Sequence, residues 1–151
     1  MPQFQAQVAL ICTPEQVFEF LIRPANALMI SPPETALNYV DVPEVLELGS
    51  RLEFDLGGFG PPQRITHEVT AFESPRLFTE SQVTGPLEKW VHQHIVEVHE
   101  HGAQLTDLIE FEPPGGMIGF LVTADRIHES LQTGFAHRHQ EMKKMLDQAD
   151  G

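Results

Sequence analysis

The sequence predicts an α+β fold in which an antiparallel sheet of about seven strands packs against one long C-terminal helix. Three observations support this fold class. Between residues 37 and 112, short runs alternate apolar and polar side chains and are joined by turns without intervening helices, so neighbouring strands must pair antiparallel. A helix start signal follows the first strand. After the strands, apolar residues recur at helical spacing over about 30 residues.

The composition limits the function classes. The chain has 151 residues, and we expect one domain spanning residues 1–151. Its 22 acidic and 9 basic side chains give a formal net charge of −13, which would repel nucleic-acid backbones and anionic membranes. The single cysteine, Cys12, excludes an intrachain disulfide and fits a reducing compartment. With no signal-peptide pattern and no run of about 18 apolar residues, we expect a cytoplasmic protein without membrane insertion or a nucleic-acid partner. The sequence leaves the oligomeric state open.

The first elements are a strand and two short helices. Residues 3–12 alternate as a strand. Thr13 can then cap a helix, Pro14 suits its first position, and Gln16 completes a capping box. This helix should end before the next proline, and residues 25–30 predict a second short helix.

The sheet region and the long helix follow. Residues 46–49 are expected to lead into the strand at 51–56. The loop after that strand is rich in Gly and Pro and carries Phe59, which is either an exposed aromatic or a flap over a pocket. The long helix should begin at Met117 and lie on the sheet. The further strands are expected at residues 37–42, 51–56, 64–73, 77–84, 89–99 and 105–112.

The order of elements, together with Thr13-Pro14-Glu15-Gln16-Val17-Phe18, resembles the START-like superfamily, which includes the Bet v 1 allergens and the polyketide cyclases. GPLEKWVHQHIVEV (residues 85–98) and LTDLIEFEPPGGMIG (residues 105–119) look like the bacterial SRPBCC ligand-binding proteins related to polyketide cyclase/dehydrases. The resemblance implies a helix-grip fold, with a curved sheet wrapped around the C-terminal helix. It also implies an internal cavity for a small hydrophobic or amphipathic molecule such as a lipid, polyketide or isoprenoid. It implies no established activity, and we expect no cofactor.

Polar side chains are expected on the inward strand faces. Buried polar groups cost roughly 1–3 kcal/mol unless they have partners, so a satisfied structural network is one interpretation. A polar end to an apolar pocket, where the groups orient a ligand carbonyl or hydroxyl, is a second. A third is a cyclase or dehydratase in which His94 and His92 act with Glu80 or Asp107 in general acid–base catalysis. The inward polar set is His67, Glu80, Gln82, His92, His94 and Asp107.

His92 and His94 with Asp107 or Glu80 would also make a plausible zinc set, but such histidine pairs are common and no metal is expected. The expected function is ligand binding; the alternatives are the enzyme and a partner-binding module with a vestigial cavity. The other histidines considered are expected to face solvent: His99, His101, His137 and His139. The expected pocket walls are Phe54, Ile65, His67, Phe78, Gln82, Trp90, Phe111, Phe120, Ala124, Ile127 and Leu131.

Overall fold

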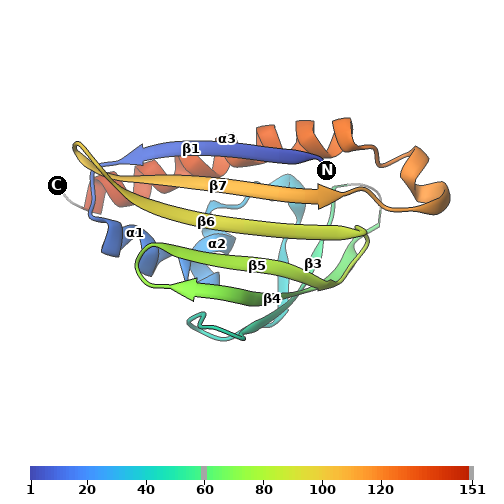
Figure 1. Ribbon diagram of the computed structural model, residues 1–151, viewed down its shortest axis with the longest axis horizontal. Helices are drawn as coiled ribbons and strands as arrows, with labels where there is room; N and C mark the ends of the chain where they lie inside the picture. Colours follow the sequence, from blue (N-terminus) through green and yellow to red (C-terminus); the bar gives the residue numbers. More distant parts are fainter. Residues whose placement is uncertain (59–60, 150–151) are drawn as a thin grey trace.

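The computed structural model describes residues 1–58 and 61–149, and within them it shows a seven-stranded sheet and three α-helices (Figure 1). Phe59 lies outside the described residues. Two short 3₁₀ helices are labelled η1 and η2. In chain order the elements are β1 (Gln3–Leu10), α1 (Pro14–Leu21), α2 (Pro24–Ile30), η1 (Pro33–Thr35), β2 (Asn38–Asp41), β3 (Arg51–Leu56), β4 (Gln63–Glu73), β5 (Leu77–Thr84), β6 (Lys89–His99), β7 (Gly102–Glu112), η2 (Gly116–Phe120) and α3 (Ala124–Ala149).

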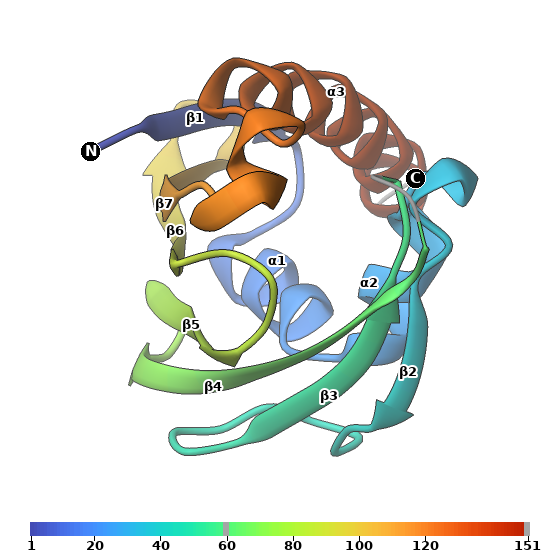
Figure 2. The same ribbon diagram turned by 90° about the vertical axis from the view of Figure 1, so that its right-hand side faces the viewer.

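The sheet confirms the predicted fold class. Its strand order is β1-β7-β6-β5-β4-β3-β2, and every neighbouring pair is antiparallel. Figure 2 shows the sheet curling through β4, β3 and β2 around α1 and α2. The long helix α3 lies beside β1 in both views and contacts it. This is the helix-grip arrangement.

The beginning of the chain folds as its local signals predict. Thr13 Oγ1 accepts a hydrogen bond from the Gln16 backbone, and Gln16 Oε1 accepts one from the Thr13 backbone. This capping box starts α1, whose buried side chains include Val17 and Phe18. Cys12 is buried, as the alternation of β1 indicates.

The start of the long helix differs from the prediction. The apolar pattern indicated a helix from Met117, but α3 begins at Ala124. Gly116 has a φ of 66°, and η2 then forms a separate short turn. Thr123 Oγ1 accepts from the Arg126 backbone and caps α3. The residues before Thr123 therefore leave the helix, and their apolar side chains are exposed: Met117, Ile118, Phe120 and Leu121.

The interior contains two apolar clusters with polar residues between them. On β7, Leu105 belongs to the first cluster and Ile109 to the second, and Asp107 lies between them in the sequence. On β6, Val96 belongs to the first cluster and Trp90 packs against the second. His92 and His94 occupy the inward positions between those two. Among the described residues, no helix is long and apolar enough to cross a membrane.

Candidate functional site

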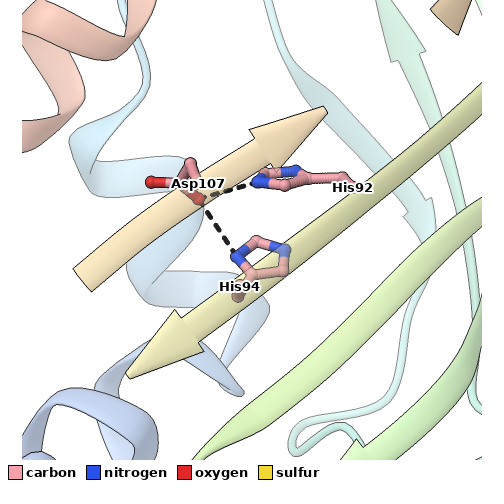
Figure 3. Close-up of side chains that lie close together, drawn as sticks. All are labelled: His92, His94 and Asp107. Carbon is pink, nitrogen blue, oxygen red and sulfur yellow. Dashed lines mark hydrogen bonds and ion pairs between the residues drawn. The ribbon is translucent and has the colours of Figure 1, made fainter. Parts of the chain in front are cut away.

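Four histidines and two acidic residues meet inside the curled sheet, and we call them the polar cluster. The register places His94 opposite Asp107, and strand alternation places His92 on the same face of β6. Figure 3 shows His92 and His94 projecting from β6 toward Asp107 on β7. The members of the polar cluster are His67 on β4, Glu80 on β5, His92 and His94 on β6, Asp107 on β7, and His139 on α3.

Asp107 lies at the centre of the polar cluster, with its side chain 3% exposed. His92 donates from Nε2 to Asp107 Oδ1 at 2.7 Å. His139 donates from Nε2 to Asp107 Oδ2 at 2.6 Å. In the part of the chain that the structure describes, the ion-pair partners of Asp107 are imidazoles, with no Lys or Arg among them. Asp107 therefore joins β6, β7 and α3 through histidine alone.

Glu80 is the second carboxylate of the polar cluster. Its Oε2 accepts a hydrogen bond from His67 Nδ1 at 3.1 Å, and its Oε1 lies 3.3 Å from His94 Nε2. Arg138 of α3 borders the same small hollow as Glu80 and His94, and its Nη1 donates to Ser31 Oγ. Glu80 thus borders a hollow with a guanidinium, whereas the ion-pair partners of Asp107 among the described residues are imidazoles.

The ionisation states follow from burial and from these contacts. Burial raises the pKa of both carboxyls. At Glu80 the interactions with His67 and His94 outweigh this effect. At Asp107 the interactions with His139 and His92 outweigh it. The pKa of each carboxyl therefore lies well below its usual value. Burial and the neighbouring His94 lower the pKa of His92 to about 4, against the opposing effect of Asp107. At neutral pH both carboxyls are ionised, and His92 is neutral with its proton on Nε2, the atom that donates to Asp107.

His94 is buried without a hydrogen bond. Its side chain is 5% exposed, and its ring is stacked between those of Phe78 (centroids 4.0 Å apart) and His92 (3.8 Å). Its Nδ1 lies 3.4 Å from Asp107 Oδ1 and its Nε2 3.3 Å from Glu80 Oε1. Both distances fit an ion pair, but the directions do not fit a hydrogen bond, and neither nitrogen has a hydrogen-bond partner among the described residues.

Trp90 provides another buried polar group without a partner. Its indole Nε1 is inaccessible to solvent and has no hydrogen-bond partner among the described residues. The ring packs against the second apolar cluster, beside the rings of His67 and His92, with both centroid distances 6.3 Å. The inner wall therefore presents an unpaired N–H donor next to apolar side chains.

The enclosed space beside the polar cluster is small. A hollow bordered by Glu80, His94 and Arg138 has a volume of about 30 Å³, which is enough for about one water molecule. The ligand-sized cavity implied by the family resemblance is not open at this position. A wider groove beside α1 is open to solvent, and its lining, which includes Cys12 and Leu146, contains no member of the polar cluster.

Most of the predicted wall residues lie in the interior. Gln82 is half-buried, and its Nε2 donates to the Leu87 carbonyl at 2.7 Å, so its amide is used within the turn between β5 and β6. Phe120 was expected on the helix stripe, but it lies in η2 and is 84% exposed, so this prediction is wrong. The buried wall residues are Phe54, Ile65, Phe78, Phe111 and Ile127, and the half-buried ones are Trp90, Ala124 and Leu131.

His139 was missed from the sequence. We expected it to face solvent near the helix end, but it is 7% exposed and bonded to Asp107. The helical spacing contained the signal, because His139 lies four residues after Phe135 and three before Met142, which are both buried. The place of His139 among the buried apolar residues of the helix indicated burial more strongly than its polar side chain indicated exposure.

Comparison with solved structures finds the same fold in several proteins. Protein CV1439 from Chromobacterium violaceum has a TM-score of 0.74 at 12% identity, over 97% of this chain and 99% of that one. TTHA0849 from Thermus thermophilus has a TM-score of 0.70 at 13% identity, over 99% of each chain. The major latex-like protein 151 from Panax ginseng has a TM-score of 0.68 at 13% identity, over 95% of this chain and 96% of that one. The TM-scores show a shared fold.

The curled sheet, the two short helices and the long C-terminal helix form a helix-grip fold of the Bet v 1-like kind. A comparison with functionally curated proteins finds no match. A family model described as a domain of unknown function, DUF8410, matches residues 13–146, and the chain belongs to this family.

Proposed function

We propose that residues 1–151 form a single cytoplasmic domain that binds a small amphipathic molecule between the sheet and α3. The polar group of the ligand would meet the inner face of β6. The proposed ligand has an apolar body and at least one hydrogen-bond acceptor, as in a lipid, a polyketide or an isoprenoid alcohol. The observation that carries the proposal is the buried indole N–H of Trp90, which has no partner among the described residues.

The buried N–H group of Trp90 destabilises the empty protein. A buried donor without an acceptor costs roughly 1–3 kcal/mol. A ligand oxygen placed against Trp90 Nε1 would remove this cost, while the ligand body would contact the surrounding apolar side chains. Leu131 of α3 and Leu87 before β6 pack with Trp90 against the second apolar cluster. A few fixed polar groups in an apolar wall are typical of small-molecule sites.

Binding must also open space, because the enclosed hollow beside the polar cluster holds only about 30 Å³. The segment best suited to move is η2 with the beginning of α3. It follows Gly115 and begins with Gly116, and its apolar side chains Met117, Ile118 and Phe120 are exposed. We propose that a ligand enters under this segment, and that the segment then closes over the apolar part of the ligand.

The cyclase or dehydratase alternative has less support from the geometry. His92 donates from Nε2 to Asp107, and the Asp107 oxygens accept from two imidazoles. Burial and the neighbouring His94 lower the pKa of His92 to about 4, which makes it a weak base at neutral pH. We therefore assign His92 and Asp107 to the wall of the binding site.

The intrinsic fluorescence of Trp90 provides the test, because Trp90 is the only tryptophan of the chain. Native mass spectrometry of freshly purified protein should first reveal any co-purifying small molecule. The protein is then titrated with a medium-chain fatty acid, farnesol and an aromatic polyketide such as a flavonoid. At least one of these probes should change the Trp90 emission in a saturable manner.

Two variants on neighbouring positions of α3 complete the test. Leu131→Trp fills the proposed space and should abolish binding, while Gln132→Trp places the same side chain on an exposed position and should preserve it. Because both add a second tryptophan, their binding is measured by calorimetry. If no probe binds and nothing co-purifies, the proposal is wrong and the partner-binding module with a vestigial cavity is favoured.

A further inference from the structure

We propose that His92, His94 and Asp107 form a binding site for one divalent transition-metal ion, of the kind that zinc or cobalt occupies. The proposal differs from the sequence-based expectation of no metal, and it does not depend on small-molecule binding. All three residues are buried, and each offers one ligand atom within 4.8 Å of the other two.

The ligand types suit such an ion. Two imidazole nitrogens and one carboxylate oxygen are common zinc ligands, and sites with three protein ligands leave a fourth position for water or substrate. Zinc bonds of about 2.0–2.1 Å in tetrahedral geometry place neighbouring ligand atoms about 3.3 Å apart. His94 Nδ1 lies 3.4 Å from Asp107 Oδ1, which matches this spacing.

His92 requires a small adjustment. Its Nε2 lies 2.7 Å from Asp107 Oδ1, because a proton now joins the two atoms. A metal ion would replace that proton, and His92 would then carry its hydrogen on Nδ1. The two atoms would move apart by about 0.6 Å to reach tetrahedral spacing, which a small side-chain rotation supplies. His92 stays neutral in this exchange, because Nδ1 gains the proton that Nε2 loses.

His94 is the observation that favours a cation over a purely structural network. A buried imidazole normally has hydrogen-bond partners, yet neither nitrogen of His94 has one among the described residues. Its Nδ1 lies 3.4 Å from Asp107 Oδ1, but its ring is stacked on that of His92 with the centroids 3.8 Å apart, so the His94 ring would turn for the two lone pairs to meet at one ion. Its Nε2 lies 3.3 Å from Glu80 Oε1, and the same turn would direct the Nε2 hydrogen toward that carboxylate.

The surrounding residues match the outer shell of a metal site. Histidine ligands commonly donate their other ring N–H to a carboxylate, which fixes the ring orientation. Glu80 Oε1, 3.3 Å from His94 Nε2, would take this role once the His94 ring turns, and His67 Nδ1 in turn donates to Glu80. On the other side, His139 donates to Asp107 Oδ2 and leaves Oδ1 for the ion. Glu80 and His139 are therefore positioning residues.

The charge of the site also favours a cation. Asp107 is buried, and a buried carboxylate needs a compensating positive charge. Its ion-pair partners among the described residues are three imidazoles, whereas Glu80 shares a small hollow with the guanidinium of Arg138. That hollow borders His94 but neither His92 nor Asp107, so it lies beside the proposed ion position.

Cobalt binding to the full chain tests the proposal. The protein is treated with a chelator, and Co²⁺ alone is then offered both to the native protein and during refolding, because the site is closed. The expected result is one Co²⁺ per chain with a visible d–d spectrum of a four-coordinate site, and displacement of the Co²⁺ by Zn²⁺. The melting temperature should rise with the metal concentration.

Three variants separate the site from adventitious binding. His94→Gln keeps a polar side chain of similar size and should lose the visible spectrum. Glu80→Gln should keep the stoichiometry but weaken binding by about 10–100-fold, as outer-shell changes do. His101→Ala removes an exposed histidine and should bind like the wild type.

The proposal is wrong if the wild-type protein shows no Co²⁺ spectrum. It is also wrong if His94→Gln binds as tightly as the wild type, because surface groups then hold the ion. If His94→Gln does not fold, Glu80→Gln decides, and an unchanged affinity in that variant overturns the site. Failure of the fatty-acid, farnesol and flavonoid titrations would leave this result unaffected.

Discussion

His139 Nε2 on α3 donates to Asp107 Oδ2 on β7 at 2.6 Å, and this hydrogen bond connects the long helix to the middle of β7. Both side chains are less than a tenth exposed. Removing one partner from a buried, charged hydrogen bond leaves the other without compensation.

His139→Leu should therefore lower the free energy of unfolding by about 3–5 kcal/mol, measured by urea denaturation of the metal-free protein. Gln140→Leu is the matched control, because Gln140 is the next residue of α3 and is exposed. A loss below about 1 kcal/mol in His139→Leu would show that Asp107 is stabilised by His92 alone.

Gly134→Ala should stabilise the protein. Gly134 lies within α3, and a Cβ at this position would meet only Pro32 Cγ, at 4.0 Å, which is an ordinary contact. Replacing a helical glycine by alanine gains about 0.8–1.0 kcal/mol, so the melting temperature should rise by a few degrees.

Gly102→Ala is the contrasting substitution. Gly102 has a φ of 155°, and a Cβ there would lie 2.2 Å from the Leu10 carbonyl oxygen, so the strand pair at the start of β7 would have to shift. This variant should be destabilised. Equal effects of the two alanines would contradict the packing described for both sites.

Asp147 should make a pH-dependent contribution to stability. Its Oδ1 accepts from the Ile11 backbone at 3.1 Å and its Oδ2 from Lys143 Nζ at 2.7 Å. Burial raises the pKa of Asp147, but these two donors outweigh it and hold the pKa below its usual value. The unfolded state, with a pKa of about 3.9, then binds the proton more readily, so stability is gained as the pH rises through this range.

The variant Asp147→Asn isolates this contribution. Above about pH 5 the wild type should be more stable by up to about 1 kcal/mol, and the difference should disappear as the pH falls below the folded-state pKa. Urea denaturation of both proteins at pH 7 and near pH 3 measures it. A constant difference at both pH values would show that the charge of Asp147 contributes nothing. Glu129→Gln, on an exposed position of α3, is the control.

Two phenylalanines of the same apolar pattern, Phe120 and Phe135, should respond differently to truncation. Phe135 is 7% exposed in the second apolar cluster, and Phe135→Ala should cost about 3–5 kcal/mol of unfolding free energy. Phe120 is 84% exposed in η2, and Phe120→Ala should change stability by less than about 0.5 kcal/mol. Thermal unfolding of both variants tests the position of η2; a large loss in Phe120→Ala would place this side chain in the core.

The fold was accessible from the sequence because its signals are local. The Thr13–Gln16 capping box and the alternation in β6 and β7 depend on neighbouring residues only, and each predicted the observed element. Strand alternation also placed five of the six polar-cluster residues on inward faces. The register irregularities between β4 and β5 left His67 and Glu80 on the same side.

Two features could not be predicted in this way, because they depend on packing between distant segments. Whether Phe120 continues a helix is decided by the chain direction after Gly116 and by the cap at Thr123. Whether the interior is hollow is decided by how closely α3 approaches the sheet. His139 differs from these, since its place on the helical stripe was visible in the sequence.

The position of β1 at the edge of the sheet has a consequence for how the protein folds. β1 pairs only with β7, and Gln3 stands opposite Glu110, 107 residues later. During synthesis, β1 must therefore wait until β7 has been made, with its apolar side chains exposed. Closing so long a loop is entropically costly, and topologies rich in distant pairings fold on the millisecond-to-second scale. A chaperone that shields β1 during this interval would protect the nascent chain from aggregation.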